Sequence, residues 1–382
     1  MGKFAEDPTL HWLEMFAMAP ANYDAPLAAE LKPIAGLTVK IAEPLARYTS
    51  MKIGGPADYF IEAENDAALA NLLGALSRHQ ENFCLLGNGS NVLISDRGVR
   101  GAVIHLAGEF KQAQWREEDE TARLNVGAAC AVAQLVRQAA RKGYSGLEFA
   151  EGIPGSVGGA LFMNAGAFGS EFEKVVDQVE AMTPRGEPLH LARAQMTFSY
   201  RDSHLPEGTI ITRVGMILHK QESIEVTSKV RELVGKRKSN QPSGFPNSGS
   251  MFRNPPGDYA GRLIEAAGLK GERIGQAQIS ERHANFIVNH GGAKADDVRR
   301  LMELARSEVH KQFGVELVAE GRLLASRHAS RAAQCCQSQR GYGVVTRGSR
   351  SARSRCGSSA RAQALTVRGP PSSASCVICR PW

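Results

Sequence analysis

The apolar residues of this chain alternate between strand-like and helix-like spacing from about residue 37 to residue 324. Residues 58–63 (DYFIEA) alternate as in a half-buried strand, and Asn65 or Asp66 then stands where a helix cap is preferred. The helix that follows is expected to bury one face, formed by Leu69, Leu72, Leu73 and Leu76. Strands and helices mixed in this way predict an α+β fold.

The second half of the pattern indicates more than one domain. A helix over residues 132–142 is expected to stop at Gly143, and residues 226–237 predict a connecting helix at a domain boundary. A long helix is expected between Asp296 and Gly314. Residues 1–36 lack clear periodicity, which predicts a loosely docked N-terminal extension.

Composition separates the last 58 residues from the rest. Residues 325–382 contain ten arginines, no lysine and no acidic residue, so the first 324 residues carry −3 of the total net charge of +7. This Arg/Ser/Cys-rich tail has no apolar periodicity and is expected to be disordered. Five of the seven cysteines lie in it, and the other two, Cys84 and Cys130, stand in apolar surroundings that favour buried free thiols. No signal peptide or membrane span is recognisable, so a cytoplasmic protein is expected.

Two glycine-rich loops suggest a nucleotide cofactor. In residues 85–95 (LLGNGSNVLIS), Gly87 and Gly89 allow a tight turn with consecutive N–H groups exposed, which suits a pyrophosphate. A strand rather than a helix follows, which disfavours a Rossmann-type unit. Residues 152–169 contain six glycines and allow the backbone to pass flat against a ligand. The alternatives are a turn between two strands for the first loop and a closely packed helix start for the second.

These loops stand among five further motifs in a fixed order: YTSMKIGGPAD (48–58), FSYRDS (198–203), NSGSMFRNP (247–255), GQAQISERHANFIVN (275–289) and VELVAEGRL (315–323). Together they resemble the UDP-N-acetylenolpyruvoylglucosamine reductase (MurB) family over residues 37–324. The 48 positions between Arg201 and Ser250 contain no tyrosine, as in the shorter type of the family, which lacks an extra tyrosine-bearing segment.

The resemblance implies a two-subdomain FAD-binding module of the vanillyl-alcohol-oxidase (PCMH) type over residues 37–223, divided near residue 107. A C-terminal α/β substrate-binding domain over residues 224–324 would follow. It also implies non-covalent FAD, NADPH as reductant, and UDP-N-acetylglucosamine enolpyruvate as substrate, with no metal ion. The residues then expected to bind FAD are Tyr48, Thr49, Ile53, Gly54, Gly55, Pro56, Gly87, Asn88, Gly89, Ser90, Asn91, Val92, Leu93, Gly152, Ile153, Pro154, Gly155, Ser156, Gly158, Gly159, Ala160, Asn164, Ala165, Gly166 and Ala167.

Reduction of an enolpyruvyl ether creates negative charge beside a carboxylate and then requires a proton. The resemblance assigns the cation to Arg201, the proton donor to Ser250 and a third catalytic group to Glu320. Without it, Arg201 would be a strand-end partner of Asp202, and Glu316 is a rival for Glu320. Substrate contacts are expected from Tyr200, Lys238, Asn247, Arg253 and Asn254.

Two other functions remain open. A flavin oxidase of the same superfamily would use oxygen and another substrate, whereas an Arg-rich nucleic-acid binder would act through the tail. The expectation adopted is a monomeric enzyme of peptidoglycan precursor synthesis with a small-molecule substrate and neither a nucleic-acid nor a membrane partner.

Overall fold

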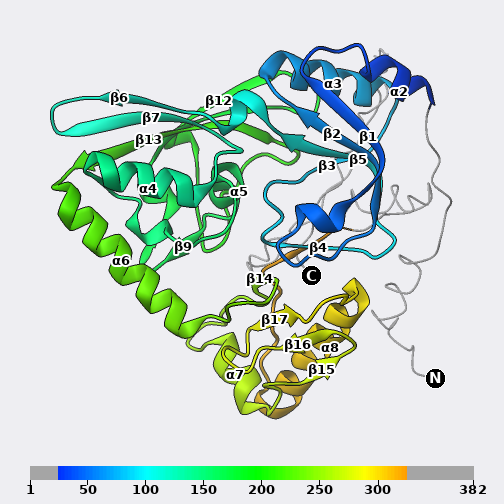
Figure 1. Ribbon diagram of the computed structural model, residues 1–382, viewed down its shortest axis with the longest axis vertical. Coiled ribbons are helices and arrows are strands. Elements are labelled where there is room, and N and C mark those ends of the chain that lie inside the picture. The colour runs from blue at the N-terminus through cyan, green and yellow to red at the C-terminus, as the bar shows by residue number, and fades with distance from the viewer. Residues whose placement is uncertain (1–24, 325–382) are drawn as a thin grey trace, which may run out of the picture. The chain divides into compact units, whose positions relative to one another are not determined.

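The computed structural model describes residues 25–324 (Figure 1). The expectations for residues 1–24 and for the tail after residue 324 lie outside the described residues. Within residues 25–324, no helix is both long and apolar enough to cross a membrane. Strands and helices are mixed along this part of the chain, as an α+β fold requires.

The first sheet has four strands in the order β1-β2-β5-β3. Strand β2 pairs antiparallel with β1 and parallel with β5. Helix α3 (Asp66–Arg78) packs against this sheet, and the Asn65 side chain caps it by accepting from the Ala68 N–H at 2.9 Å. All four predicted leucines of α3 are buried, which confirms the helical face. The strands are β1 Leu37–Pro44, β2 Pro56–Ala63, β3 Phe83–Leu85 and β5 Val99–Leu106.

The N-terminal extension differs from the expectation over its last residues. Residues Ala25–Leu31 form helix α2, which lies beside α3 (Figure 1). Leu27 and Leu31 are fully buried in the same core as the α3 leucines. Two apolar residues four positions apart are too few for a periodicity signal in the sequence, yet they are sufficient to fix a short helix against an existing apolar face.

The second sheet is antiparallel, with β12, β11, β13, β7 and β6 in that order and β8 paired to β13. Helix α4 (Val132–Lys142) ends at Gly143, whose φ of 74° gives the left-handed cap that the sequence predicted. The short helix α5 (Val157–Phe162) contacts β7 and β13. The strands are β6 Ala113–Glu117, β7 Thr121–Gly127, β8 Tyr144–Ser145, β11 Val176–Met182, β12 Pro188–Ala192 and β13 Ile210–Lys220.

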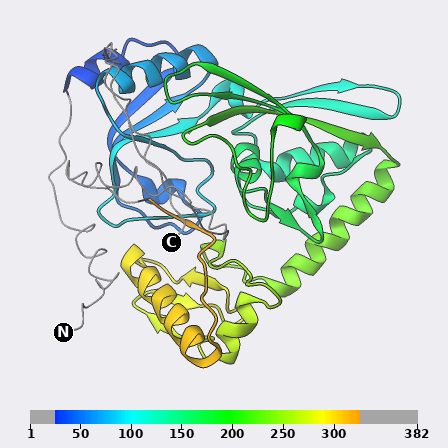
Figure 2. The same cartoon turned by 180° about the vertical axis from the view of Figure 1, so that it is seen from behind.

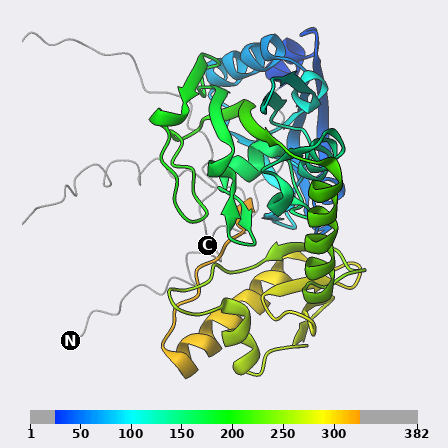
Figure 3. The same cartoon turned by 90° about the vertical axis from the view of Figure 1, so that its left-hand side faces the viewer.

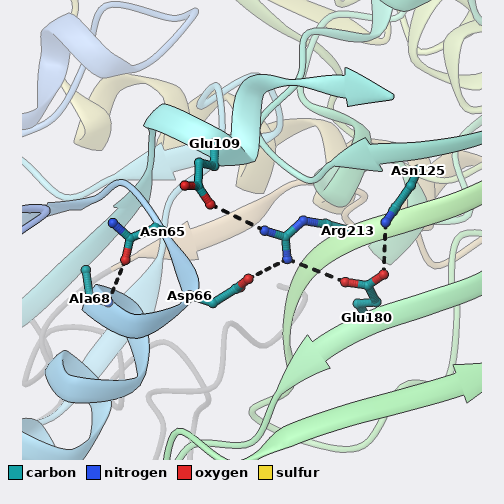
Figure 4. Close-up of polar contacts among 7 residues, drawn as sticks. All are labelled: Asn65, Asp66, Ala68, Glu109, Asn125, Glu180 and Arg213. Carbon is teal, nitrogen blue, oxygen red and sulfur yellow. Dashed lines mark hydrogen bonds and ion pairs between the residues drawn. The ribbon is translucent and has the colours of Figure 1, made fainter. Parts of the chain in front are cut away.

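Arg213 on β13 joins the two sheets electrostatically (Figure 4). Its guanidinium lies 2.6 Å from Asp66 at the start of α3, 3.4 Å from Glu180 on β11 and 3.8 Å from Glu109. Asn125 on β7 donates to the second oxygen of Glu180 at 3.0 Å. One cation therefore holds carboxylates from both subdomains.

Helix α6 (Ser223–Asn240) leads from the second sheet into the C-terminal region, as all three ribbon views show (Figures 1, 2 and 3). A sheet in the order β14-β17-β16-β15 follows, and α8 (Ala295–Phe313) lies across β15 and β16 (Figure 2). The helix predicted between Asp296 and Gly314 is confirmed as α8, which buries Val298, Leu301, Met302, Ala305 and Val309 on one face. The remaining elements are α7 Ala260–Ala266, β14 Asn247–Ser250, β15 Arg273–Ile274, β16 Ala277–Ile279 and β17 Phe286–Asn289.

The last described strand, β18 (Arg322–Leu324), leaves the C-terminal region. It pairs in parallel with β4 (Val92–Ile94), which directly follows the first glycine-rich loop. Leu324 is buried in the same apolar cluster as Leu45 and Phe60 of the first subdomain. The C-terminal domain predicted to end at residue 324 therefore returns its final strand to the N-terminal module.

Short elements complete the description. Strands β9 Gly166–Ala167 and β10 Ser170–Glu171 form a small antiparallel pair within the second glycine-rich stretch. The 3-10 helices are η1 Leu45–Tyr48, η2 Gly108–Lys111, η3 Glu148–Ala150, η4 Phe172–Lys174 and η5 Arg193–Gln195.

Candidate active site

A cavity of about 1060 Å³ brings together the segments that the sequence singled out. It slightly exceeds the ~300–1,000 Å³ range of ordinary small-molecule sites, so it has room for a large cofactor and part of a substrate. Its wall includes Arg201, Ser250, Glu320 and Asn247. The residues of the two predicted FAD loops that line it are Gly87, Asn88, Gly89, Ser90, Asn91, Val92, Gly152, Ile153, Pro154, Gly155, Ser156, Gly158, Gly159, Ala160, Ala165, Gly166 and Ala167.

The first loop turns sharply at Gly89, where φ is +60°. A Cβ atom on Gly89 would lie 2.1 Å from the carbonyl oxygen of Tyr48, so no larger residue fits without backbone movement. The Ser50 N–H donates to the Gly89 carbonyl at 3.0 Å. The segment around Tyr48 therefore supports the loop from behind.

This support explains where the other residues of YTSMKIGG lie. Thr49 is buried, and its hydroxyl donates to the Ile53 carbonyl at 2.9 Å. A Cβ on Gly55 would lie 2.2 Å from the Asp96 carbonyl oxygen, because the two backbones cross closely there. The predicted FAD residues that form this support instead of the cavity wall are Tyr48, Thr49, Ile53, Gly54, Gly55, Pro56 and Leu93.

The second loop is fixed to the first by a hydrogen bond from the Ser90 hydroxyl to the Pro154 carbonyl at 2.9 Å. Ser156 caps α5, and a Cβ on Gly87 would lie 2.8 Å from its hydroxyl oxygen. Asn164 is fully buried beneath the loop and donates to Glu171 at 2.7 Å. Asn164, one of the residues predicted to bind FAD, thus shapes the loop from below.

Arg201 stands at the tip of a two-residue turn. Ser199 and Asp202 exchange backbone hydrogen bonds of 2.9 and 3.1 Å, and Arg201 between them has a φ of +60°. Such a conformation is costly for a residue with a side chain and often marks a functional position. The turn is anchored to the second glycine-rich loop, because Asn164 donates to the Ser199 carbonyl at 3.2 Å.

The side chain of Arg201 meets the predicted third catalytic group. Its Nε atom lies 2.8 Å from Oε1 of Glu320, and both side chains are less than one-fifth exposed. Burial raises the pKa of the Glu320 carboxyl, while the charges of Arg201 and Arg253 act in the opposite direction. Glu316, the rival candidate, is 77% exposed and paired with Arg306, so the geometry favours Glu320.

Ser250, the third predicted catalytic residue, lines the cavity together with Arg201 and Glu320. It ends β14 opposite Phe286, after Gly249 with a φ of 79°. The Glu320 N–H donates to the carbonyl of Met251, the next residue, at 2.9 Å. The serine loop and the Glu320 strand are therefore joined through the backbone, and the three predicted catalytic side chains share one wall.

Comparisons with known proteins agree with this arrangement. A family model described as an FAD binding domain matches residues 57–192, and one described as the C-terminal domain of UDP-N-acetylenolpyruvoylglucosamine reductase matches residues 241–324. UDP-N-acetylenolpyruvoylglucosamine reductase 2 of Symbiobacterium thermophilum is 46% identical over 300 residues, which are 78% of this chain and 96% of that protein. The chain belongs to the UDP-N-acetylenolpyruvoylglucosamine reductase family. The reductase of Myxococcus xanthus is 41% identical over 303 residues, 79% of this chain and 97% of that protein. The crystal structure of the reductase (MurB) from Thermus caldophilus aligns with a TM-score of 0.64 at 38% identity, covering 75% of this chain and 98% of that chain.

The two residues before Glu320 join it to the serine loop through their backbones. The Val318 carbonyl accepts from the Arg253 N–H at 2.8 Å, and Ala319 bridges to Phe252. These contacts help to place Glu320.

The predicted substrate residues of this reductase divide into two groups. Asn247 lines the cavity, whereas Tyr200, Lys238, Arg253 and Asn254 do not. The Asn254 side chain accepts from the Ala260 N–H at 3.1 Å and so holds the start of α7. Arg253 lies close enough to influence the Glu320 carboxyl.

One cavity residue that the sequence reasoning missed is Arg237, next to the predicted Lys238. Helix α6 buries Val226, Val230 and Leu233, and the same helical spacing continues to Arg237. Lys238 falls off this stripe and is exposed. The periodicity of the helix was the signal that could have identified Arg237.

The described residues contain no cluster of three or more His, Cys, Asp or Glu side chains placed to hold a metal ion. Cys84 and Cys130 are buried free thiols, as predicted.

Proposed function

We propose that the chain catalyses the NADPH-dependent reduction of UDP-N-acetylglucosamine enolpyruvate to UDP-N-acetylmuramate, in the synthesis of peptidoglycan precursors. Membership of the reductase family supports the reaction, and the FAD binding domain over residues 57–192 supports the cofactor. The observation that carries the proposal is the Arg201–Glu320 pair on the wall of a large cavity, joined by backbone to the loop of Ser250.

The cavity fits FAD because two glycine-rich loops form much of its wall. Gly87, Gly89 and Gly155 line it, and each is packed so closely against the neighbouring chain that no larger side chain fits, as at Gly155, where a Cβ would lie 2.9 Å from the Ser90 hydroxyl oxygen. The glycine-rich loops of residues 87–92 and 152–167 would hold the cofactor between them. When bound, FAD supplies the two-electron chemistry that carries a hydride from NADPH to the substrate.

We assign the stabilisation of charge to Arg201. Reduction of the enolpyruvyl double bond at C3 leaves negative charge on C2 and on the neighbouring carboxylate. A guanidinium keeps its positive charge in proteins and binds a carboxylate through paired N–H donors. Glu320 holds that guanidinium in place, and because burial raises its pKa, its protonated form is favoured more than that of an exposed carboxyl.

We assign the proton delivered to C2 to the hydroxyl of Ser250. Its place between Gly249 and the strand bridge to Phe286 restricts the movement of the backbone that carries it. General acid catalysis by a positioned side chain contributes about 10²–10⁴ in rate, which is the loss expected on removing the hydroxyl.

Anaerobic stopped-flow spectroscopy of the flavin-loaded protein tests the proposal. We expect NADPH to bleach the flavin band and UDP-N-acetylglucosamine enolpyruvate to restore it. Ser250→Ala should slow only the restoration, whereas Ser243→Ala, which changes an exposed serine of the same loop that does not line the cavity, should behave as wild type. A flavin that stays reduced until air is admitted would show an oxidase instead.

The proposal includes a cytoplasmic, monomeric enzyme. A cytoplasmic location fits a reaction that consumes NADPH and a UDP-linked substrate. Light scattering coupled to size-exclusion chromatography would measure the oligomeric state, and a dimer mass would contradict this part.

A further inference from the structure

We propose that Arg237 binds a phosphate group of a nucleotide held in the cavity. The inference deepens the proposed function, on which the choice of nucleotides rests: FAD, NADPH and the UDP-linked substrate all carry a diphosphate. It places a phosphate contact one position before Lys238, which the sequence analysis expected to contact the substrate.

The first support is the state of the guanidinium. Arg237 lines the cavity from α6, and its Nε and Nη2 atoms are buried without a hydrogen-bond partner among residues 25–324. Buried donors without partners carry a substantial desolvation penalty unless an acceptor arrives. Burial also lowers the pKa of this guanidinium, with Glu151 acting in the opposite direction, yet an arginine stays charged in a protein.

The second support is the balance of charge around it. Glu151 is the acidic group that acts on Arg237, and it is 4% exposed. Glu151 is already paired with Arg137, whose Nη2 lies 3.2 Å from its Oε1. Glu151 therefore shares its negative charge with Arg137 and does not neutralise Arg237 alone.

The third support is that the side chain is held in place. A Cβ on Gly152 would lie 2.7 Å from Cδ of Arg237, so the glycine of the second loop leaves space for the arginine stem. The Phe168 ring centroid lies 5.5 Å from Cζ of Arg237, and Phe168 has a φ of +54° while remaining 48% exposed. A strained, exposed phenylalanine that packs on an arginine is a feature of binding sites more than of apolar cores.

A phosphate matches these observations better than a carboxylate or a neutral group. The guanidinium fork pairs with phosphate oxygens through two N–H donors, and the free donors of Arg237 can provide such a contact. The contact lies beside the second glycine-rich loop, whose Pro154 carbonyl is hydrogen-bonded to Ser90 of the first. Arg201, the other cavity arginine discussed above, is already paired with Glu320.

The test compares Arg237→Ala and Arg237→Lys with Arg231→Ala, which removes an exposed arginine from the same helix away from the cavity. Three quantities are measured: the Kd for FAD by flavin fluorescence, and the KM values for NADPH and for UDP-N-acetylglucosamine enolpyruvate. Loss of a charge-assisted contact should weaken one of them by about 10- to 100-fold, with kcat changed only a few-fold. Arg237→Lys should retain part of the affinity because it keeps the charge without the fork.

The affected quantity identifies the source of the phosphate. A raised Kd for FAD assigns it to the cofactor, and a raised KM for one substrate assigns it to that substrate. If all three stay within twofold of Arg231→Ala in both variants, the proposal is overturned.

Thermal melting of the apoproteins checks folding, and if the alanine variant does not fold, Arg237→Lys and Arg237→Gln decide by the same criterion. Should the protein show no reductase turnover, the Kd for FAD and a calorimetric titration with UDP still report on Arg237, so the two failures are distinguishable.

Discussion

Gly89→Ala is the substitution that most directly tests the shape of the first glycine-rich loop. Gly89 combines a φ of +60° with a backbone oxygen, that of Tyr48, only 2.1 Å from where a Cβ would stand. Ordinary contacts between carbon and oxygen are more than 1 Å longer, so the loop or the segment behind it must move. Either movement displaces a loop that lines the cavity.

The magnitude follows from two contributions. Left-handed backbone costs a residue with a Cβ about 1–2 kcal/mol. Forcing an extra methyl group into a packed site costs about 1–3 kcal/mol. We therefore expect the apoprotein to lose about 2–5 kcal/mol of unfolding free energy, which in a chain of this size lowers Tm by about 3–8 °C. Displacement of the loop should also weaken FAD binding at least tenfold, which is about 1.4 kcal/mol.

Gly235→Ala provides a control of opposite sign. Gly235 lies inside α6, and a Cβ there meets nothing within 4 Å among the described residues. Alanine in a helix interior is favoured over glycine by about 0.5–1 kcal/mol, so this variant should be slightly more stable. Differential scanning calorimetry of both apoproteins and FAD titration by fluorescence measure the two effects. A Gly89→Ala protein with wild-type Tm and wild-type FAD affinity would refute the idea that the loop is held by close backbone contact.

Two further predictions concern buried charges. Folding raises the pKa of Glu320 above its ordinary value of 4.5, so folding favours the protonated carboxyl. The protonated carboxyl therefore stabilises the folded protein fully below pH 4.5, and this stabilisation is lost as the pH rises through the raised pKa. The Tm of Glu320→Gln relative to wild type should therefore be higher at pH 8 than at pH 4.5, and equal differences at both pH values would contradict this. Arg213→Met should lower unfolding free energy by about 1–3 kcal/mol, because three carboxylates lose their shared cation, while FAD affinity stays at its wild-type value. Arg306→Met removes a partly exposed arginine that pairs with a single exposed carboxylate, and it should change the unfolding free energy by less than about 0.5 kcal/mol. A loss as large as that of Arg213→Met would contradict the idea that the shared cation of Arg213 is what stabilises the protein.

The elements that the sequence predicted well are those defined by local spacing. Helix α3, helix α4 and helix α8 each combine an apolar face with a recognisable terminus, and the structure confirms all three. The resemblance to the reductase family also placed Arg201, Ser250 and Glu320 together, and they share one cavity.

Local pattern does not reveal which side of a loop a residue faces. The segment from Tyr48 to Pro56 is rich in small and polar residues, as a ligand-binding loop would be, yet its backbone supports Gly89 from behind. Lys238 and Arg237 are adjacent cations, and only the helical phase set by Leu233 distinguishes the one that lines the cavity. Such distinctions depend on tertiary packing, which motif composition does not encode.

Strand β18 connects the end of the described chain to the first subdomain. Strand β4 follows the first glycine-rich loop directly, and β18 pairs with it two residues after Glu320. The Arg322 N–H donates to the Asn91 carbonyl at 3.1 Å, so the first glycine-rich loop and the strand that follows Glu320 share a backbone hydrogen bond. Glu320 is therefore fixed against Arg201 by contacts with the first subdomain as well as by the C-terminal region. The role proposed for Glu320 thus depends on both domains, and a substitution that loosens either should disturb it.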